Sequence, residues 1–107
     1  MKLRRIVLFV DDLDKAILFY KNTVQLPVNE ERSGWIEFDT GATSIALHQG
    51  KGRKPRFEYA VHDLQMAERE ANTQGWRCIR KVGIDGNTYL EGKDKDGNTI
   101  RLLVERD

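Results

Sequence analysis

Arginine and glutamate occur in three matched places along this 107-residue chain. Arg5, Arg56 and Arg101 stand in alternating, strand-like segments, and three glutamates are predicted to face the same way: Glu37, Glu58 and Glu91. A guanidinium presents N–H donors in a planar fork that matches a carboxylate or a phosphate. The arginines therefore predict an anion-binding pocket. The alternative is an ion-pair network with the glutamates, because a buried charge without a partner is costly.

Aromatic residues accompany these charges. Trp35 and Tyr89 occupy equivalent places in the two halves of the chain, where they would clamp a planar ligand or pack at a rim or a dimer contact. His48 is the one histidine predicted on the same faces, and it is the single candidate for a general base near neutral pH. The alternative for His48 is a hydrogen-bonded residue at the rim, so no catalytic residue is assigned.

Composition limits the classes of protein. The chain has 18 Lys and Arg against 17 Asp and Glu, a net charge of +1, whereas a nucleic-acid-binding protein usually carries a basic excess. The longest apolar stretch, 6–10, is far too short to span a membrane. The single cysteine, Cys78, forms no internal disulfide, which fits a reducing compartment. We therefore expect a cytoplasmic protein that binds neither nucleic acid nor a membrane.

Alternation of apolar and polar residues predicts the strands. In the first half they cover 4–10, 35–39 and 44–49, and in the second half 56–61, 76–82, 88–93 and 98–105. An apolar stripe from Leu13 to Val24 predicts one helix, capped by Asp11 or Asp12 and ended by Pro27. A thinner stripe after Asp63 predicts a second helix that ends near Gly75.

The two halves repeat each other. Residues 10–16 match 61–67 at an offset of 51, 35–37 match 89–91 at 54, and 45–47 match 100–102 at 55. The predicted order is strand, helix and three strands, twice. We therefore expect one α+β domain over 1–107, made of two tandem βαβββ modules at about 1–50 and 56–107 with a linker at about 50–55.

Each predicted sheet has one face under its helix and one face left over. The faces under the helices carry Ile6, Leu8, Val10, Phe38 and Leu47 in one half, and Phe57, Tyr59, Val61, Leu90 and Leu102 in the other. The opposite faces carry Arg5, Val7, Phe9, Trp35, Glu37, Ala46 and His48, and Arg56, Glu58, Ala60, Tyr89, Glu91, Arg101 and Leu103. This mixture of polar and aromatic residues is typical of a concave, wet lining.

Four segments resemble the vicinal oxygen chelate superfamily, which includes glyoxalase I, extradiol dioxygenases and fosfomycin- and bleomycin-resistance proteins. They are 9–16 with Phe19-Tyr20, 35–38, 61–64, and Asp94-Lys95-Asp96-Gly97-Asn98, where Lys95 replaces a usual proline. The resemblance covers the whole chain. It implies two βαβββ modules that form a side-open cup, and often a homodimer.

The resemblance also implies where a metal would bind. Metal-dependent members take His or Glu ligands from four strand positions, which fall here on Arg5, Ala46, Arg56 and Arg101. An arginine stays protonated and has no lone pair for a divalent ion. A register shift of two would bring His48 to the place of Ala46, but one histidine with a glutamate falls short of a three-ligand site. We therefore expect neither a metal nor another cofactor.

These observations predict a metal-free small-molecule binding protein that takes a planar or anionic compound in the cup between its modules and forms a homodimer. The predicted ligand-binding residues are Arg5, Phe9, Trp35, Glu37, His48, Arg56, Glu58, Tyr89, Glu91 and Arg101. Two alternatives remain open. One is a glyoxalase-like lyase or isomerase with a non-standard site at His48, and the other is a protein-interaction module.

Overall fold

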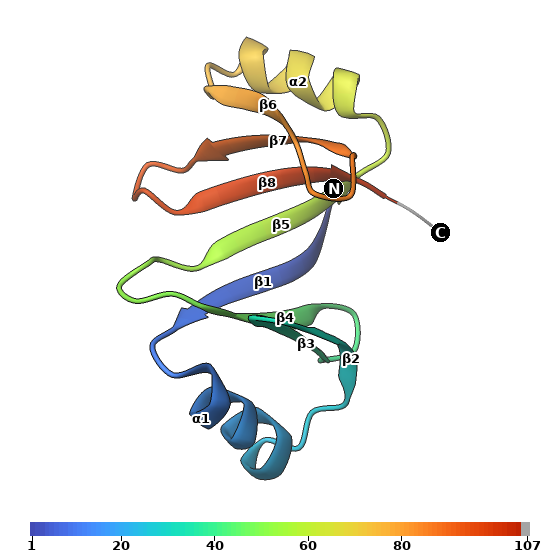
Figure 1. Ribbon diagram of the computed structural model, residues 1–107. Coiled ribbons are helices and arrows are strands. Elements are labelled where there is room, and N and C mark those ends of the chain that lie inside the picture. Colours follow the sequence, from blue (N-terminus) through green and yellow to red (C-terminus); the bar gives the residue numbers. More distant parts are fainter. Residues whose placement is uncertain (106–107) are drawn as a thin grey trace. The chain divides into compact units, whose positions relative to one another are not determined.

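The computed structural model describes residues 1–105, which form two compact units. One unit is Arg4–Pro55, and the other joins Met1–Leu3 to the chain from Arg56 onward. We call them module one and module two. Module one contains β1 (Lys2–Val10) from Arg4 onward, α1 (Leu13–Leu18), the π-helix η1 (Phe19–Thr23), β2 (Val28–Arg32), β3 (Trp35–Asp39) and β4 (Ser44–Gln49) (Figure 1).

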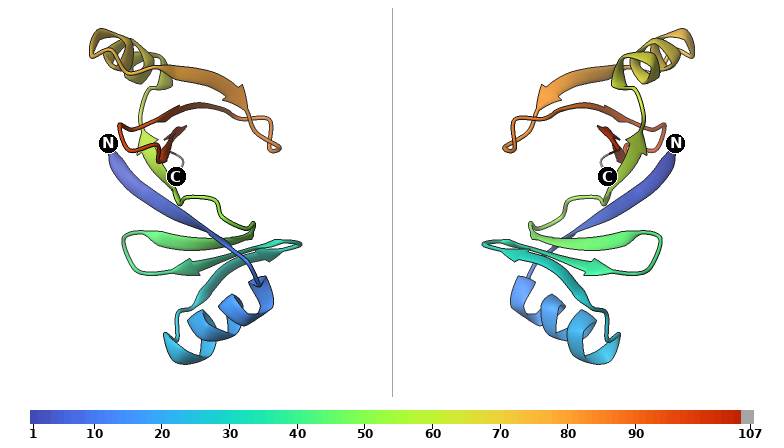
Figure 2. Two further views of the ribbon diagram at one scale, coloured as in Figure 1. Left: turned by 90° about the vertical axis from the view of Figure 1, so that its left-hand side faces the viewer. Right: turned by 90° about the vertical axis from the view of Figure 1, so that its right-hand side faces the viewer.

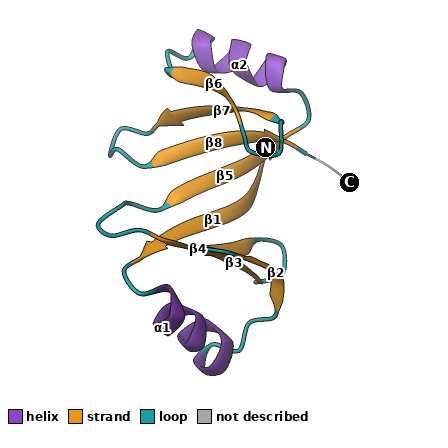
Figure 3. Ribbon diagram, viewed as in Figure 1, coloured by secondary structure: helices purple, strands orange, loops and turns teal. Residues whose placement is uncertain are grey.

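Module two repeats this order of elements. It contains β5 (Arg56–Val61), α2 (Leu64–Thr73), β6 (Cys78–Val82), β7 (Thr88–Lys93) and β8 (Thr99–Val104) (Figure 3). The strands run β2-β3-β4-β1 in module one and β5-β8-β7-β6 in module two. The pairs β1/β4 and β5/β8 are parallel, and the others are antiparallel. The predicted α+β class with two βαβββ modules is confirmed.

Both main helices begin in the same way. The Asp12 carboxylate accepts a hydrogen bond from the Lys15 backbone N–H (3.1 Å), and the Asp63 carboxylate accepts one from Met66 (3.0 Å). Each aspartate satisfies a backbone donor that the first helical turn leaves without a partner. These caps fix where each helix leaves its sheet.

The prediction for the first helix is wrong at its end. After Leu18 the chain widens into the π-helix η1, and Val24 is exposed rather than part of a buried stripe. A π-helical turn takes more residues than an α-helical turn, so the apolar positions fall out of line.

Three strands follow the first helix, whereas the sequence pattern predicts only two of them, and β2 is the strand without a signal. This strand has the sequence Val-Asn-Glu-Glu-Arg, and all five residues are exposed. It lies at the edge of the sheet and pairs only with β3 among the described strands. Charged side chains are common on edge strands because they oppose unwanted pairing. They also remove the apolar alternation that reveals a strand in a sequence.

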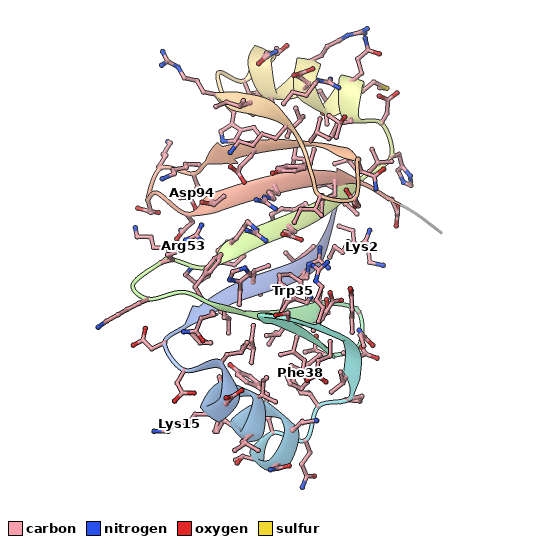
Figure 4. The ribbon with its side chains drawn as sticks, in the orientation of Figure 1. Lys2, Lys15, Trp35, Phe38, Arg53 and Asp94 are labelled. Carbon is pink, nitrogen blue, oxygen red and sulfur yellow. The ribbon has the colours of Figure 1, made fainter. Side chains whose placement is uncertain are left out.

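The core of module one lies between α1 and its sheet (Figure 2). Ile36, Phe38 and Leu47 are fully buried there, and α1 and η1 contribute Leu13, Ala16, Ile17 and Tyr20. Figure 4 shows Phe38 on the side of β3 that faces α1. Four predicted core residues are confirmed in this cluster: Leu8, Val10, Phe38 and Leu47.

The core of module two lies between α2 and its sheet. Val61, Leu64, Leu90 and Leu102 are buried, and Tyr59, Ala67, Trp76, Cys78 and Ile100 pack against them. Ile6 and Phe57, which were predicted at equivalent places in the two cores, lie outside these clusters. The first strand of each module contributes core residues two and four positions after Ile6 or Phe57. These are Leu8 and Val10 in module one and Tyr59 and Val61 in module two.

None of the helices within residues 1–105 has the length and apolar character that a membrane span requires.

Candidate functional site

The face of each sheet that lies opposite its helix carries the predicted site residues. We call it the helix-free face. In module two, Arg101 of β8 stands directly between Glu58 of β5 and Glu91 of β7. In module one, Ala46 of β4 stands in the same way between Val7 and Glu37. The predicted equivalence of Ala46 and Arg101 is therefore confirmed, and His48 does not occupy that position.

Charged groups form a network on the helix-free face of module two. The Arg56 Nε donates to Glu58 Oε2 (2.8 Å), and the Arg101 Nε donates to Glu91 Oε1 (2.6 Å). Arg101 also lies 4.0 Å from Glu58, and Lys81 reaches the second oxygen of Glu91 at 2.5 Å. Among these five described side chains, three cations lie beside two carboxylates, so their charges sum to +1.

Burial and pairing act on this network in opposite directions. Glu58 is 1% exposed, and the guanidinium groups of Arg56 and Arg101 lie beside it, which compensates for the loss of water around its carboxyl group. Burial lowers the pKa of Arg56, and the Glu58 carboxylate counteracts this. Burial also opposes ionisation of Glu91, but hydrogen bonds from Lys81 and Arg101 outweigh it and lower the pKa of Glu91. Glu91 therefore carries a negative charge at neutral pH.

Module one has one ion pair in place of this network. Arg5 donates to Glu37 Oε1 at 2.7 Å, and the hydroxyl of Ser44 donates to Glu37 Oε2 at 3.0 Å. The three predicted arginines are thus each held by one of the three predicted glutamates. The alternative stated from the sequence, an ion-pair network, is confirmed as geometry.

Guanidinium groups lie over the aromatic rings of both helix-free faces. Arg101 lies 4.4 Å from the centre of the Tyr89 ring. Arg5 and Arg32 lie 5.3 and 4.8 Å from the Trp35 ring. Arg53 lies 4.2 Å from the Phe9 ring. At these distances the positive charge of a guanidinium group is attracted to the electron-rich face of the ring.

Trp35 is more deeply buried than a wet lining would require. Its side chain is 6% exposed and packs with Val7 and Ala46, which are fully buried. The expectation of a wet surface is therefore wrong for these three residues, and also for Glu58 and Ala60. The large indole of Trp35 covers the small side chains of Val7 and Ala46 and so keeps water away from them. Among the described residues, the Trp35 Nε1 is a buried donor without a hydrogen-bond partner.

His48 is held in an ordered position beside the aromatic group. Its ring lies 5.5 Å from the Phe9 ring and 6.2 Å from the Trp35 ring. The Nδ1 lies 2.7 Å from the Gln49 carbonyl oxygen, which only accepts, so Nδ1 carries the proton in this arrangement. The alternative of a hydrogen-bonded histidine is thus realised.

The residues present do not fit a metal site of the kind that the resemblance implies. The four positions carry three arginines, each bonded to a glutamate, and one alanine that is fully buried. Within residues 1–105, no group of three His, Cys, Asp or Glu side chains is placed to hold a metal ion. We therefore derive no chemistry through a metal.

Four further residues complete these faces and were not predicted from the sequence. Arg32 and Arg53 reach the aromatic rings from the exposed strand β2 and from the linker, while Lys81 and Ser44 each bond a glutamate. Lys81 was detectable. It lies two residues after Ile79 on β6, so both side chains point to the same face, and Ile79 is paired with Glu91. Arg32 and Arg53 gave no signal, because neither lies in an alternating segment.

The sequence was compared with models of protein families and with curated proteins. The family model described as Glyoxalase/Bleomycin resistance protein/Dioxygenase superfamily matches residues 2–102. A search of curated proteins by sequence found no match.

Solved structures share the fold at low sequence identity. A glyoxalase/bleomycin resistance protein/dioxygenase superfamily member from Vibrio splendidus 12B01 is 16% identical, with a TM-score of 0.77 over 97% of this chain and 100% of that chain. A hypothetical protein from Bacillus halodurans C-125 is 14% identical, with a TM-score of 0.80 over 99% and 95%. An extradiol ring-cleaving dioxygenase from B. fuscum is 19% identical, with a TM-score of 0.72 over 99% of this chain and 32% of that chain. At these identities the likeness concerns the fold alone.

Proposed function

The chain belongs to the glyoxalase/bleomycin resistance protein/dioxygenase superfamily, and on that premise we propose that it is a metal-free small-molecule binding protein. Its ligand is a planar or anionic compound held on a helix-free face by arginine and aromatic side chains. The proposal keeps the cytoplasmic homodimer expected from the sequence.

One observation carries this proposal. At the positions where metal-dependent relatives would need ligands, this chain has arginines that are fixed by glutamates, and guanidinium groups stack on Trp35, Phe9 and Tyr89. Fixed guanidinium groups lose little conformational entropy when an anion binds. Aromatic rings beside them favour a flat ligand.

Module two offers the stronger anion site. Its network has an excess positive charge, and the Arg101 side chain is 24% exposed, so solvent and ligands reach it. Tyr89 supports the guanidinium from one side. A carboxylate or phosphate group is expected to bind at the edge of Arg101, with its planar part against Tyr89.

Thermal-shift measurements on metal-stripped protein test the proposal. The probes are benzoate, salicylate and phenyl phosphate, each compared with Zn²⁺, Mn²⁺ and Ni²⁺ alone. A probe at a hundred times its dissociation constant stabilises the fold by about 2.7 kcal/mol, a rise of several degrees for this size of domain.

Two arginine variants make this test specific. Arg101→Ala should remove the rise, whereas Arg80→Ala should keep it, because Arg80 is also paired with a glutamate but contacts Glu68 of α2. A rise caused only by metal ions, or an equal rise in both variants, contradicts the proposal.

A further inference from the structure

Module two has an open pocket on the other side of its sheet, between α2 and the strands. Its volume is about 270 Å³, and its walls are apolar: Tyr59, Ala67, Ala71, Trp76, Ile100 and Leu102. This is the face covered by the helix, whereas Arg101 and Tyr89 lie on the helix-free face. The pocket is therefore separate from the proposed anion site.

The repeat shows why this space is open. In module one, Tyr20 packs against Phe38 with the ring centres 5.8 Å apart, and this pair fills the space between helix and sheet. At the repeat offsets of 51 and 54, Tyr20 corresponds to Ala71 and Phe38 to Gly92. Strand pairing agrees, because Phe38 faces Ile45 and Gly92 faces the equivalent Ile100.

Module two lacks rings at the positions of Tyr20 and Phe38, and only the ring of Phe38 is replaced by another aromatic side chain. The Trp76 indole lies directly on Gly92, where a Cβ atom would be only 2.6 Å from the Trp76 Cζ2. The indole N–H donates to the Lys93 carbonyl oxygen at 2.9 Å, which fixes the ring there. At the place of Tyr20, Ala71 lines the pocket, and the side chain of Met1 also borders it.

The chemistry of the pocket defines its occupant. Module one shows that a phenol ring fits between such a helix and such a sheet. Glu70 of α2 and Gln74, which directly follows α2, border the pocket, and both are exposed. A carboxylate at this border favours a hydrogen-bond donor or a positive charge on the ligand and disfavours an anion. The volume lies just below the usual range for ligand pockets, about 300–1,000 Å³, so the ligand is small.

We propose that module two binds a small aromatic amine or phenol of one or two rings in the pocket between α2 and its sheet, where Ala71 replaces the tyrosine of module one. The ring lies against Trp76 and Tyr59, and its donor group points to Glu70.

Tyramine is the probe that tests this site, with 3-(4-hydroxyphenyl)propionate as its anionic counterpart. The full chain is labelled with ¹⁵N, and the amides of Ala67 and Ala71 and the Trp76 indole N–H are followed by NMR during titration. Tyramine should shift these signals in a saturable way, and the propionate should bind roughly fivefold more weakly. Glu70→Gln should remove this preference while phenol itself still binds.

Variants that fill the pocket make the test decisive. Ala71→Tyr restores the residue of module one, so it should abolish tyramine binding and raise the Tm. Ala71→Leu serves as a second, smaller filling in case tyrosine disturbs the fold. Arg101→Ala should leave tyramine binding unchanged, which separates this site from the proposed anion site.

Three results would overturn the inference. The first is that tyramine still binds to folded Ala71→Leu protein with unchanged affinity. The second is that tyramine shifts only residues of the helix-free face. The third is that the pocket signals move with protein concentration alone, which would assign the pocket to a side chain from a second copy of the chain.

Discussion

The two modules share a backbone plan but differ in the side chains on both faces of their sheets. On the helix-free face, module one buries small apolar residues under Trp35, whereas module two buries Glu58 among cations. On the helix side, module one is filled by Tyr20 and Phe38, whereas module two is open at Ala71. Caps and strand register maintain the shared plan, so the side chains between them are able to diverge.

The largest expected effect on stability comes from replacing the buried Glu58 of module two with valine, the residue at the equivalent position of module one. Glu58→Val corresponds to Val7 and leaves Arg56 and Arg101 with one carboxylate fewer. We expect a loss of about 3–5 kcal/mol in the free energy of unfolding, measured by urea denaturation.

The double variant sharpens this test. Glu58→Val combined with Arg101→Ala rebuilds the row of module one, where Arg5 bonds Glu37 beside Ala46. Arg56 is then expected to bond Glu91, and about half of the lost stability should return. If the two losses simply add, the modules are not equivalent on this face.

A cavity in module one is the next largest expected effect. Tyr20→Ala should cost about 2–3 kcal/mol, less than for a fully buried aromatic residue because Tyr20 is only half-buried. Phenol should recover part of this loss by filling the new space. The measurement is the Tm with and without phenol, and Lys15→Ala on the outer side of α1 is the control (Figure 4). A loss without rescue would show that module one collapses where module two stays open.

Gly92 tests the close contact that replaces Phe38. A Cβ atom at this position would lie 2.5 Å from the Arg77 carbonyl oxygen as well as against the Trp76 ring. Gly92→Ala should therefore destabilise the fold by about 1–3 kcal/mol, as measured by urea denaturation. Lys93→Ala, the adjacent exposed position, should change stability by less than about 0.5 kcal/mol. Equal effects would show that Trp76 moves freely.

The smallest expected effect is a dependence on pH. The pKa of Glu91 is lowered in the folded protein, so its stabilising contribution is complete above the unfolded value of about 4.3. It is lost as the pH falls through the lower folded value. Glu91→Gln should therefore lose about 1 kcal/mol at pH 7, and the difference from the unchanged protein should shrink below about pH 4.3.

The control for pH is Glu31→Gln on the exposed strand β2. It should show no such convergence in urea denaturation at a series of pH values. A difference that stays constant for Glu91→Gln down to about pH 3 would contradict the role of its ion pairs.

Most of the fold was predictable because the same local signals occur in both halves of the chain. The two aspartate caps and the strands 35–39, 44–49, 56–61 and 88–93 were found because alternation and capping are local signals. The strand β2 was not found, because its exposed and charged side chains carry no apolar pattern.

The site residues were predictable as faces but not as contacts. Alternation assigned Arg5, Arg56 and Arg101 to one side of their strands, and the glutamates to the same side. It did not show that the Trp35 indole would bury Val7 and Ala46, because that depends on packing across three strands. The pocket at Ala71 was visible only as a thin apolar stripe, since the absence of a side chain leaves no other trace in a sequence.

Calorimetric titration of metal-stripped protein with phenyl phosphate tests the central claim most directly. The account predicts binding that is about tenfold weaker in Arg101→Ala and unchanged within about twofold in Arg80→Ala. Binding of equal strength in both variants, or binding that requires an added divalent metal, would contradict a metal-free anion site on the helix-free face.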